Sequence, residues 1–130
     1  MENKVVVHMK DGTLYKGITQ DFLPDKDSFH ILHGEGGGIP RKIMTEQMKA
    51  LFFVKDWIGN KDYVTVREFV DQKQYGRRAI LTFNDGETIL GTIQGYDKAR
   101  KGFFFFPVDP NDNNVRIYVV ASSVKKIEFS

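Results

Sequence analysis

The chain has 130 residues, 41% apolar and 28% charged, a composition that fits one soluble domain or two very small ones. Its apolar runs reach only five residues, whereas a membrane-spanning helix needs about 20, and its first residues lack the pattern of a secretory signal. The chain has no cysteine, which excludes disulfides, thiolate metal sites and a cysteine nucleophile. The net charge of +2 neither requires nor excludes a polyanionic partner.

The strongest pattern in the sequence is an internal repeat. The dipeptide Asp11-Gly12 recurs 74 residues later as Asp85-Gly86, and glycine and apolar positions match at the same offset. These matches are Gly17 with Gly91, Phe22 with Tyr96, Phe29 with Phe103 and Ile31 with Phe105. Towards the ends the offset becomes 76, as in Met48 with Val124, Leu51 with Ile127 and Phe53 with Phe129. The repeat predicts two domains, 1–57 and 77–130, with a connector over 58–76.

Each copy is predicted to be a meander of five strands, because runs rich in β-branched and aromatic residues alternate with turn residues. In chain order, the strands of the first copy are expected at 4–9, 13–22, 28–33, 39–44 and 48–55. Those of the second copy are expected at 78–83, 87–97, 102–107, 114–120 and 124–129. The Asp-Gly pairs predict hairpin turns, where glycine accepts a positive φ. In the connector, a helical turn is expected around residues 66–70.

Five short antiparallel strands cannot bury both faces as a flat sheet. Curling into a small barrel encloses one apolar face and removes the exposed edges. Gly17 and Gly91 lie in the middle of the long second strands, where a missing side chain permits the sharp bend that such a barrel needs. The sequence therefore predicts an all-β protein made of two five-stranded, SH3-like barrels that pack together.

The order of these features resembles the Sm-like fold, here in tandem: an apolar strand, Asp-Gly, a second strand with glycine, an aromatic and acidic turn, and three further strands. The stretches ALFFVKDWIGNKDY and KGFFFFPVDPNDNNVRIYVV also resemble a bacterial domain family of unknown function. Members of that family occur alone or beside PilZ and other signalling modules. The resemblance implies tandem Sm-like barrels in a bacterial signalling or regulatory context. The missing signal and cysteines add an expected cytoplasmic location.

Sm-like proteins often bind RNA, but their two binding motifs are missing here. The asparagine of the first motif is absent from the turns at 25–30 and 97–103, and the arginine-glycine pair of the second is absent near 45–47 and 122–123. The usual uridine pocket is therefore not expected. Basic residues keep RNA binding as the alternative function, since they neutralise phosphates. The candidate contacts are Lys98, Arg100, Lys101 and Lys125.

Three phenylalanines are expected to point away from the barrel cores. Successive side chains along a strand point to opposite faces, so Phe103 and Phe105 point inward while Phe104 and Phe106 point outward. By the same rule, Phe52 points outward. Exposed rings leave apolar area in water, so either the two barrels pack through them or the patch docks a second subunit or another protein. Phe52, Phe104 and Phe106 form the candidate interaction patch, for a protein partner or self-association.

No metal ion or cofactor is expected. His30 and His33 are three apart on a predicted strand, so they face opposite sides and cannot share a metal ion. The run at 109–114 resembles a calcium loop, but it lacks the glycine at the sixth place and the glutamate at the twelfth, and it predicts a polar turn instead. The glycines at 34–38 lack the Gly-Lys-Ser/Thr ending of a phosphate-binding loop.

The inventory of catalytic groups is thin, so the sequence favours a protein that is not an enzyme. The second copy has no histidine, and no Gly-x-Ser-x-Gly sequence occurs. A PilZ-type cyclic-dinucleotide site would need a (D/N)xSxxG motif, which is also missing. We therefore expect a protein-interaction module of a bacterial signalling or regulatory assembly, without a small-molecule ligand; RNA binding is the alternative.

Overall fold

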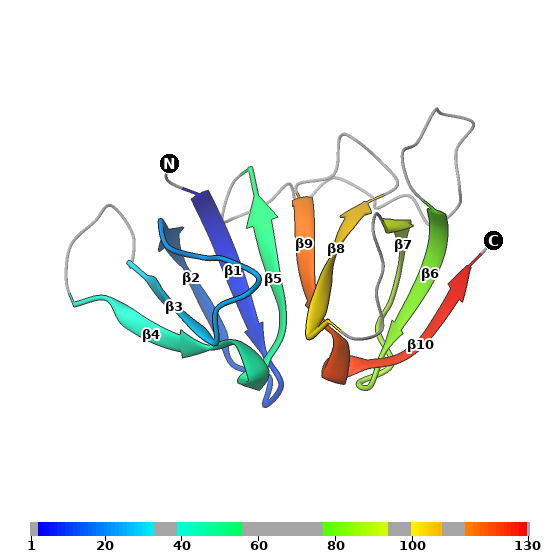
Figure 1. Ribbon diagram of the computed structural model, residues 1–130, viewed down its shortest axis with the longest axis horizontal. Coiled ribbons are helices and arrows are strands. Elements are labelled where there is room, and N and C mark those ends of the chain that lie inside the picture. The colour runs from blue at the N-terminus through cyan, green and yellow to red at the C-terminus, as the bar shows by residue number, and fades with distance from the viewer. Residues whose placement is uncertain (1–2, 33–38, 56–76, 94–99, 108–113, 130) are drawn as a thin grey trace.

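Strands make up nearly all of the regular structure in the computed structural model, which describes residues 3–32, 39–55, 77–93, 100–107 and 114–129 (Figure 1). The first half contains β1 (Asn3–Met9), β2 (Leu14–Thr19), β3 (Ser28–Ile31), β4 (Arg41–Met44), the 3₁₀ turn η1 (Thr45–Gln47) and β5 (Met48–Val54). The second half contains β6 (Arg77–Phe83), β7 (Thr88–Ile93), β8 (Gly102–Pro107), β9 (Asn114–Val120), the 3₁₀ turn η2 (Ala121–Ser123) and β10 (Val124–Phe129). The predicted all-β class is confirmed. In the described ranges no helix has the length and apolar character of a membrane span.

The predicted strands agree with the observed ones to within two residues at each end, apart from the ends of the second strand in each half; β3 ends at Ile31 rather than at residue 33, and β4 begins at Arg41 rather than at residue 39. β2 ends at Thr19 rather than at residue 22, and β7 ends at Ile93, beyond which residues 94–99 are not described. The predicted helical turn at 66–70 and the loops at 34–38 and 109–113 also lie outside the described residues.

Both Asp-Gly pairs form the hairpin turns that the sequence predicts. Gly12 and Gly86 have φ angles of 92° and 93°, in the left-handed region that favours glycine. In each turn the aspartate carboxylate accepts a hydrogen bond from the backbone N–H two residues on, over 2.9 Å in the first half and 3.0 Å in the second. The same local chemistry therefore reverses the chain in both halves.

Replacing Gly86 by valine is expected to lower the free energy of unfolding by about 1–2 kcal/mol, through backbone strain. A Cβ atom built at Gly86 meets nothing within 4 Å, so the cost comes from the positive φ and not from a clash. Urea unfolding measures the loss, and Gly86→Asn is the matched control because asparagine tolerates this conformation better. A valine variant as stable as the wild type would show that the turn does not need glycine.

The strands of the two halves follow the same order. In the second half the hydrogen-bonded order is β10-β6-β7-β8-β9. In the first half β5, β1 and β2 are adjacent, a single bridge between Ile18 and Leu32 connects β2 to the chain after β3, and β3 pairs with β4. The pairing registers also agree: Phe29 lies opposite Ile43, and Phe103 lies opposite Val119.

The halves are joined because β5 of the first pairs with β9 of the second, which gives an eight-stranded antiparallel sheet beside the β3-β4 pair (Figure 1). Among the described residues, no strand pairing closes either half into a barrel. The tandem barrels therefore stay a prediction, whereas the continuous sheet is a feature that the sequence did not indicate.

Two apolar cores lie on opposite faces of this sheet. Leu51 lies opposite Tyr118 across the β5·β9 pair, and both belong to the first core. Their neighbours Phe52 and Ile117 also lie opposite each other, and both belong to the second core. The first core also holds Val5, Val7, Phe29, Ile31, Ile43, Met48, Phe53 and Val120, and the second holds Val6, Ala50, Val54, Ala79, Leu81, Phe83, Ile93, Phe103, Phe105 and Val119. Each half therefore completes the core of the other.

Candidate functional site

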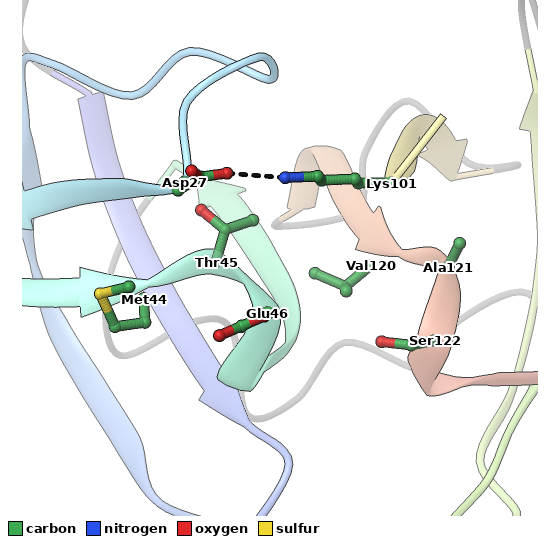
Figure 2. A pocket seen from close by; sticks show the side chains of 8 residues that line it. All are labelled: Asp27, Met44, Thr45, Glu46, Lys101, Val120, Ala121 and Ser122. Carbon is green, nitrogen blue, oxygen red and sulfur yellow. Dashed lines mark hydrogen bonds and ion pairs between the residues drawn. The ribbon is translucent and has the colours of Figure 1, made fainter. Parts of the chain in front are cut away.

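A pocket of about 470 Å³ lies between the two halves, and we call it the junction pocket (Figure 2). Both halves contribute the same structural elements to it: the residue before the third strand, the last residue of the fourth strand, and the 3₁₀ turn that follows. The first half contributes Asp27, Met44, Thr45 and Glu46, and the second contributes Lys101, Val120, Ala121 and Ser122. At the offsets of 74 and 76, these eight residues form four matched pairs.

The walls of the junction pocket are held by backbone hydrogen bonds that occur in both halves. The N–H of Thr45 donates to the carbonyl of Asp27 over 2.9 Å, and the N–H of Ala121 donates to the carbonyl of Lys101 over 2.8 Å. The ammonium of Lys10 joins the two turns, because it donates to the Glu46 carbonyl over 2.7 Å and to Ser122 Oγ over 2.5 Å. The pocket therefore has a preformed frame.

Charged side chains surround an apolar centre in the junction pocket. Figure 2 shows the ion pair of Asp27 and Lys101 along one side, Glu46 and Ser122 along the opposite side, and Val120 between them. The ion pair measures 2.6 Å between Lys101 Nζ and Asp27 Oδ1, and the hydrogen bond from Lys101 holds the pKa of Asp27 below its usual value. Both of its side chains are more than 70% exposed, so a ligand can displace either partner at little cost.

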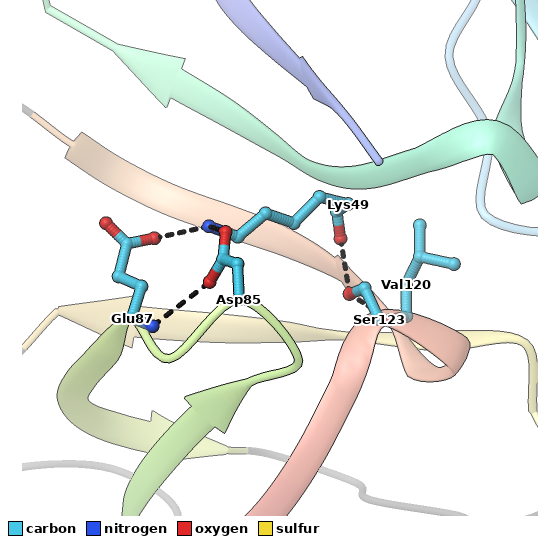
Figure 3. A network of polar contacts seen from close by, with 5 residues as sticks. All are labelled: Lys49, Asp85, Glu87, Val120 and Ser123. Atoms are coloured by element: carbon cyan, nitrogen blue, oxygen red, sulfur yellow. Dashed lines mark hydrogen bonds and ion pairs between the residues drawn. The ribbon is translucent and has the colours of Figure 1, made fainter. Parts of the chain in front are cut away.

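A second polar network connects the halves next to the pocket (Figure 3). Lys49 of β5 donates to Asp85 Oδ2 over 2.6 Å and to Glu87 Oε1 over 2.7 Å, and its side chain is only 12% exposed. Its backbone carbonyl accepts a hydrogen bond of 2.8 Å from Ser123 Oγ, which also lies 2.6 Å from the carbonyl of Val120. These bonds fix the second half's β6-β7 hairpin and η2 against β5.

The ionisation of this network favours the folded state. Burial disfavours the charged form of Lys49, but its hydrogen bonds to Asp85 and Glu87 outweigh burial and raise the pKa of the ammonium. The bond from Lys49 is also the largest cause that lowers the pKa of Asp85, with the backbone N–H of Glu87 next. Both ends of the pair are therefore charged at neutral pH.

Replacing Lys49 by methionine is expected to cost about 1–2 kcal/mol of unfolding free energy at neutral pH, because two charge-assisted hydrogen bonds to half-exposed carboxylates are lost. The folded-state pKa of Asp85 lies below the ordinary value of 3.8, so its contribution is fully present above that pH and is lost as the pH falls through the lower folded value. Urea unfolding over a pH series should show the gap between wild type and variant narrowing below that value.

The matched control is Lys126→Met, because Lys126 forms an ion pair with Glu128 in which both side chains are about half exposed or more. Little change at any pH is expected there. An equal loss in both variants, or a gap for Lys49→Met that does not depend on pH, would contradict the structural role of the Lys49 network.

Comparison with known proteins gives a family for the chain. A family model described as "Family of unknown function (DUF6982)" matches residues 1–130. The chain belongs to this family. No curated protein and no solved structure matches it. The match agrees with the resemblance to a domain family of unknown function, and it has no bearing on Sm-like barrels or on PilZ partners.

The predicted interaction patch of this DUF6982 chain is divided between core and surface. Phe52 points away from the first core, as expected, but it lies in the second core with 7% exposure and is not accessible to a partner. Phe104 is half-buried against the first core, where its ring centroid lies 5.3 Å from that of Tyr118 and the guanidinium of Arg116 lies 4.8 Å above it. Phe106 is half-buried on β8.

The structure places the predicted RNA contacts of the DUF6982 chain in different surroundings. Lys101 is paired with Asp27 in the junction pocket, whereas Lys125 lies on β10 and does not line that pocket. Arg100 is exposed next to Lys101, and Lys98 lies outside the described residues. Of the three candidates that the structure describes, Lys101 alone lines the pocket.

His30 forms polar contacts with Asp21 of the same half. His30 lies 2.8 Å from Asp21 through Nδ1, and its backbone N–H donates to the same carboxylate over 2.9 Å. The described residues contain no group of three or more His, Cys, Asp or Glu side chains placed to hold a metal ion. His33 lies outside these residues.

Sequence reasoning missed Asp27, Glu46 and Lys10 as residues of the site. A signal for two of them was present in the repeat itself. Asp27 matches Lys101 and Glu46 matches Ser122, so both pairs combine an acidic residue with a residue of different charge. Positions that a duplicated unit keeps in place but changes in charge are candidates for an asymmetric binding surface.

Proposed function

We propose that this protein is a non-enzymatic protein-interaction module made of two copies of one Sm-like unit. Support for the two copies comes from the shared strand order, the matched turn glycines and the hydrogen bonds that recur at the repeat offsets. The resemblance to a family that occurs beside signalling modules favours a bacterial signalling or regulatory assembly in the cytoplasm as the setting.

The observation that carries the proposal is the junction pocket. Its frame is held by hydrogen bonds from both halves, its centre is apolar, and its charged groups are exposed and exchangeable. Preformed pockets with a few polar groups around an apolar centre are typical of binding sites. The pocket also depends on the duplication, since one copy alone supplies only half of the lining residues.

The test uses the full chain as immobilised bait in a lysate of its native host, with two variants beside it. Ala121→Phe fills the junction pocket, and Leu14→Phe places the same side chain at a residue that is 52% exposed and does not line the pocket. We expect a protein that wild type and Leu14→Phe retain but Ala121→Phe does not. The purified partner should then bind the wild type in a defined ratio by calorimetry. The proposal would be contradicted if all three baits retained the partner equally, or if no bait retained a partner.

Titration with labelled single-stranded RNA, at low and high salt, addresses the alternative. RNA binding would give micromolar or tighter affinity that falls steeply with salt, because bound cations are released from the phosphates. We expect no binding at low salt. Tight, salt-dependent binding would replace the interaction module by an RNA-binding function.

A further inference from the structure

We infer that the junction pocket receives an arginine or lysine side chain of the protein partner, with the Glu46 carboxylate as its acceptor. The inference rests on the proposed function, because it specifies the chemistry of the partner at the same site. Three properties of the pocket support it: the balance of its charged groups, its apolar centre and its size.

The charged groups of the pocket leave one carboxylate available. The carboxylate of Asp27 already accepts from Lys101, and the ammonium of Lys10 already donates to two oxygen atoms. Glu46 is exposed, and its carboxylate forms no ion pair or hydrogen bond with the other described residues. Lys10 and Lys101 thus already bond oxygen atoms of the site. The Glu46 charge acts on Lys101, whose pKa it helps to raise, but no cation of the described residues contacts the Glu46 carboxylate, so a cationic ligand group can bind there.

The apolar centre suits the stem of a long basic side chain. Val120 is 3% exposed, and Met44 and Ala121 complete the apolar lining on the two sides. Arginine and lysine pack their methylene groups on apolar surface while the charged end reaches a polar rim. Figure 2 places Val120 between the Asp27–Lys101 pair and Glu46, so a stem that crosses the pocket above Val120, against the partly exposed Met44 and Ala121, brings its charged end to the rim.

The size and the exposed ion pair favour arginine over lysine. A volume of about 470 Å³ lies in the lower part of the range for ligand pockets, which suits one long side chain with its neighbouring backbone. The planar guanidinium binds a carboxylate through two parallel N–H groups, whereas the ammonium of lysine acts as a point charge. Asp27 offers a second carboxylate if the ligand's cation replaces Lys101 as its partner. This replacement costs little because both side chains of the Asp27–Lys101 ion pair are largely exposed.

The test is a set of NMR titrations of the isotope-labelled full chain with blocked tripeptides Ala-Arg-Ala, Ala-Lys-Ala, Ala-Leu-Ala and Ala-Glu-Ala. We expect saturable shifts of the η1 and η2 amides, with Arg binding most tightly, Lys next, and Leu and Glu at least about tenfold more weakly. Glu46→Gln keeps the shape of the residue and should weaken Arg binding about tenfold. The matched control Glu128→Gln removes another exposed carboxylate, on β10, and should leave binding unchanged.

Other results would overturn the inference. One such result is that Ala-Glu-Ala binds most tightly of the four peptides. Another is that the shifted amides lie away from η1 and η2. A third is that Glu46→Gln leaves the affinity for Ala-Arg-Ala unchanged. Its failure is distinguishable from failure of the proposed function. A partner that Ala121→Phe loses but Glu46→Gln keeps would retain the interaction module and remove the basic side chain from the pocket.

Discussion

Replacing Gly91 by alanine is expected to lower the free energy of unfolding by about 3 kcal/mol or more, a larger loss than at either turn glycine. A Cβ atom at this position would lie 2.0 Å from the backbone oxygen of Phe106 and 2.5 Å from the ring of Phe105. Phe105 is fully buried, so its ring has no free space to move into. The added methyl group therefore has to push β7 and β8 apart.

Urea unfolding with Gly86→Ala as the matched control separates this clash from the general cost of losing a glycine. A Cβ atom at Gly86 meets nothing within 4 Å, so that variant should lose only about 1 kcal/mol through its positive φ. Equal losses in the two variants would contradict the close approach of β8 to Gly91.

The second large effect is expected for Phe52→Ala, with a loss of about 3–4 kcal/mol. Phe52 belongs to β5 of the first half, but its ring lies in the second core with Phe105 and Ile117. Removing the ring leaves a cavity among the residues of β8 and β9. The damage should therefore appear in the half of the chain that does not contain the substitution.

Hydrogen exchange in the native state locates the damage. In Phe52→Ala we expect the amides of β6, β7 and β8 to lose more protection than those of β2 and β3. The control Phe29→Ala removes a ring that is 1% exposed in the first core and should show the reverse order. Loss of protection confined to the first half in both variants would mean that the cores are not shared.

Local chemistry explains why the sequence predicted the strands and turns so closely. The Asp-Gly hairpins need only a glycine with positive φ and a neighbouring carboxylate, and both are visible within four residues. The alternation rule also placed Phe52 on the correct side of its strand. What alternation cannot reveal is that this outward side of the first half is the interior of the second.

The junction pocket escaped prediction for the same reason. Asp27 and Lys101 are 74 residues apart, and they meet only because β5 pairs with β9. Strand partners distant in sequence are set by the packing of the whole molecule, and the sequence pattern favoured two barrels that pack together. Lys101 was predicted as an RNA contact because it lies in a basic turn. The sequence around it does not show that the fold places Asp27 beside it.

Gly91 shows the same limit on a smaller scale. The sequence assigned it the role of permitting a bend in the second strand. The structure adds a stricter reason, since the backbone of β8 approaches too closely for any side chain. A pattern within one strand cannot show how near the next strand will lie.

The central claim is that β5 and β9 join the halves into one sheet, and cross-strand backbone NOEs in the isotope-labelled chain test it most directly. We expect NOEs that connect Leu51 with Tyr118 and Phe52 with Ile117, following the observed register. NOEs that instead pair β9 with β10 and β4 with β5, and none between β9 and β5, would show two separately closed barrels and contradict the shared sheet.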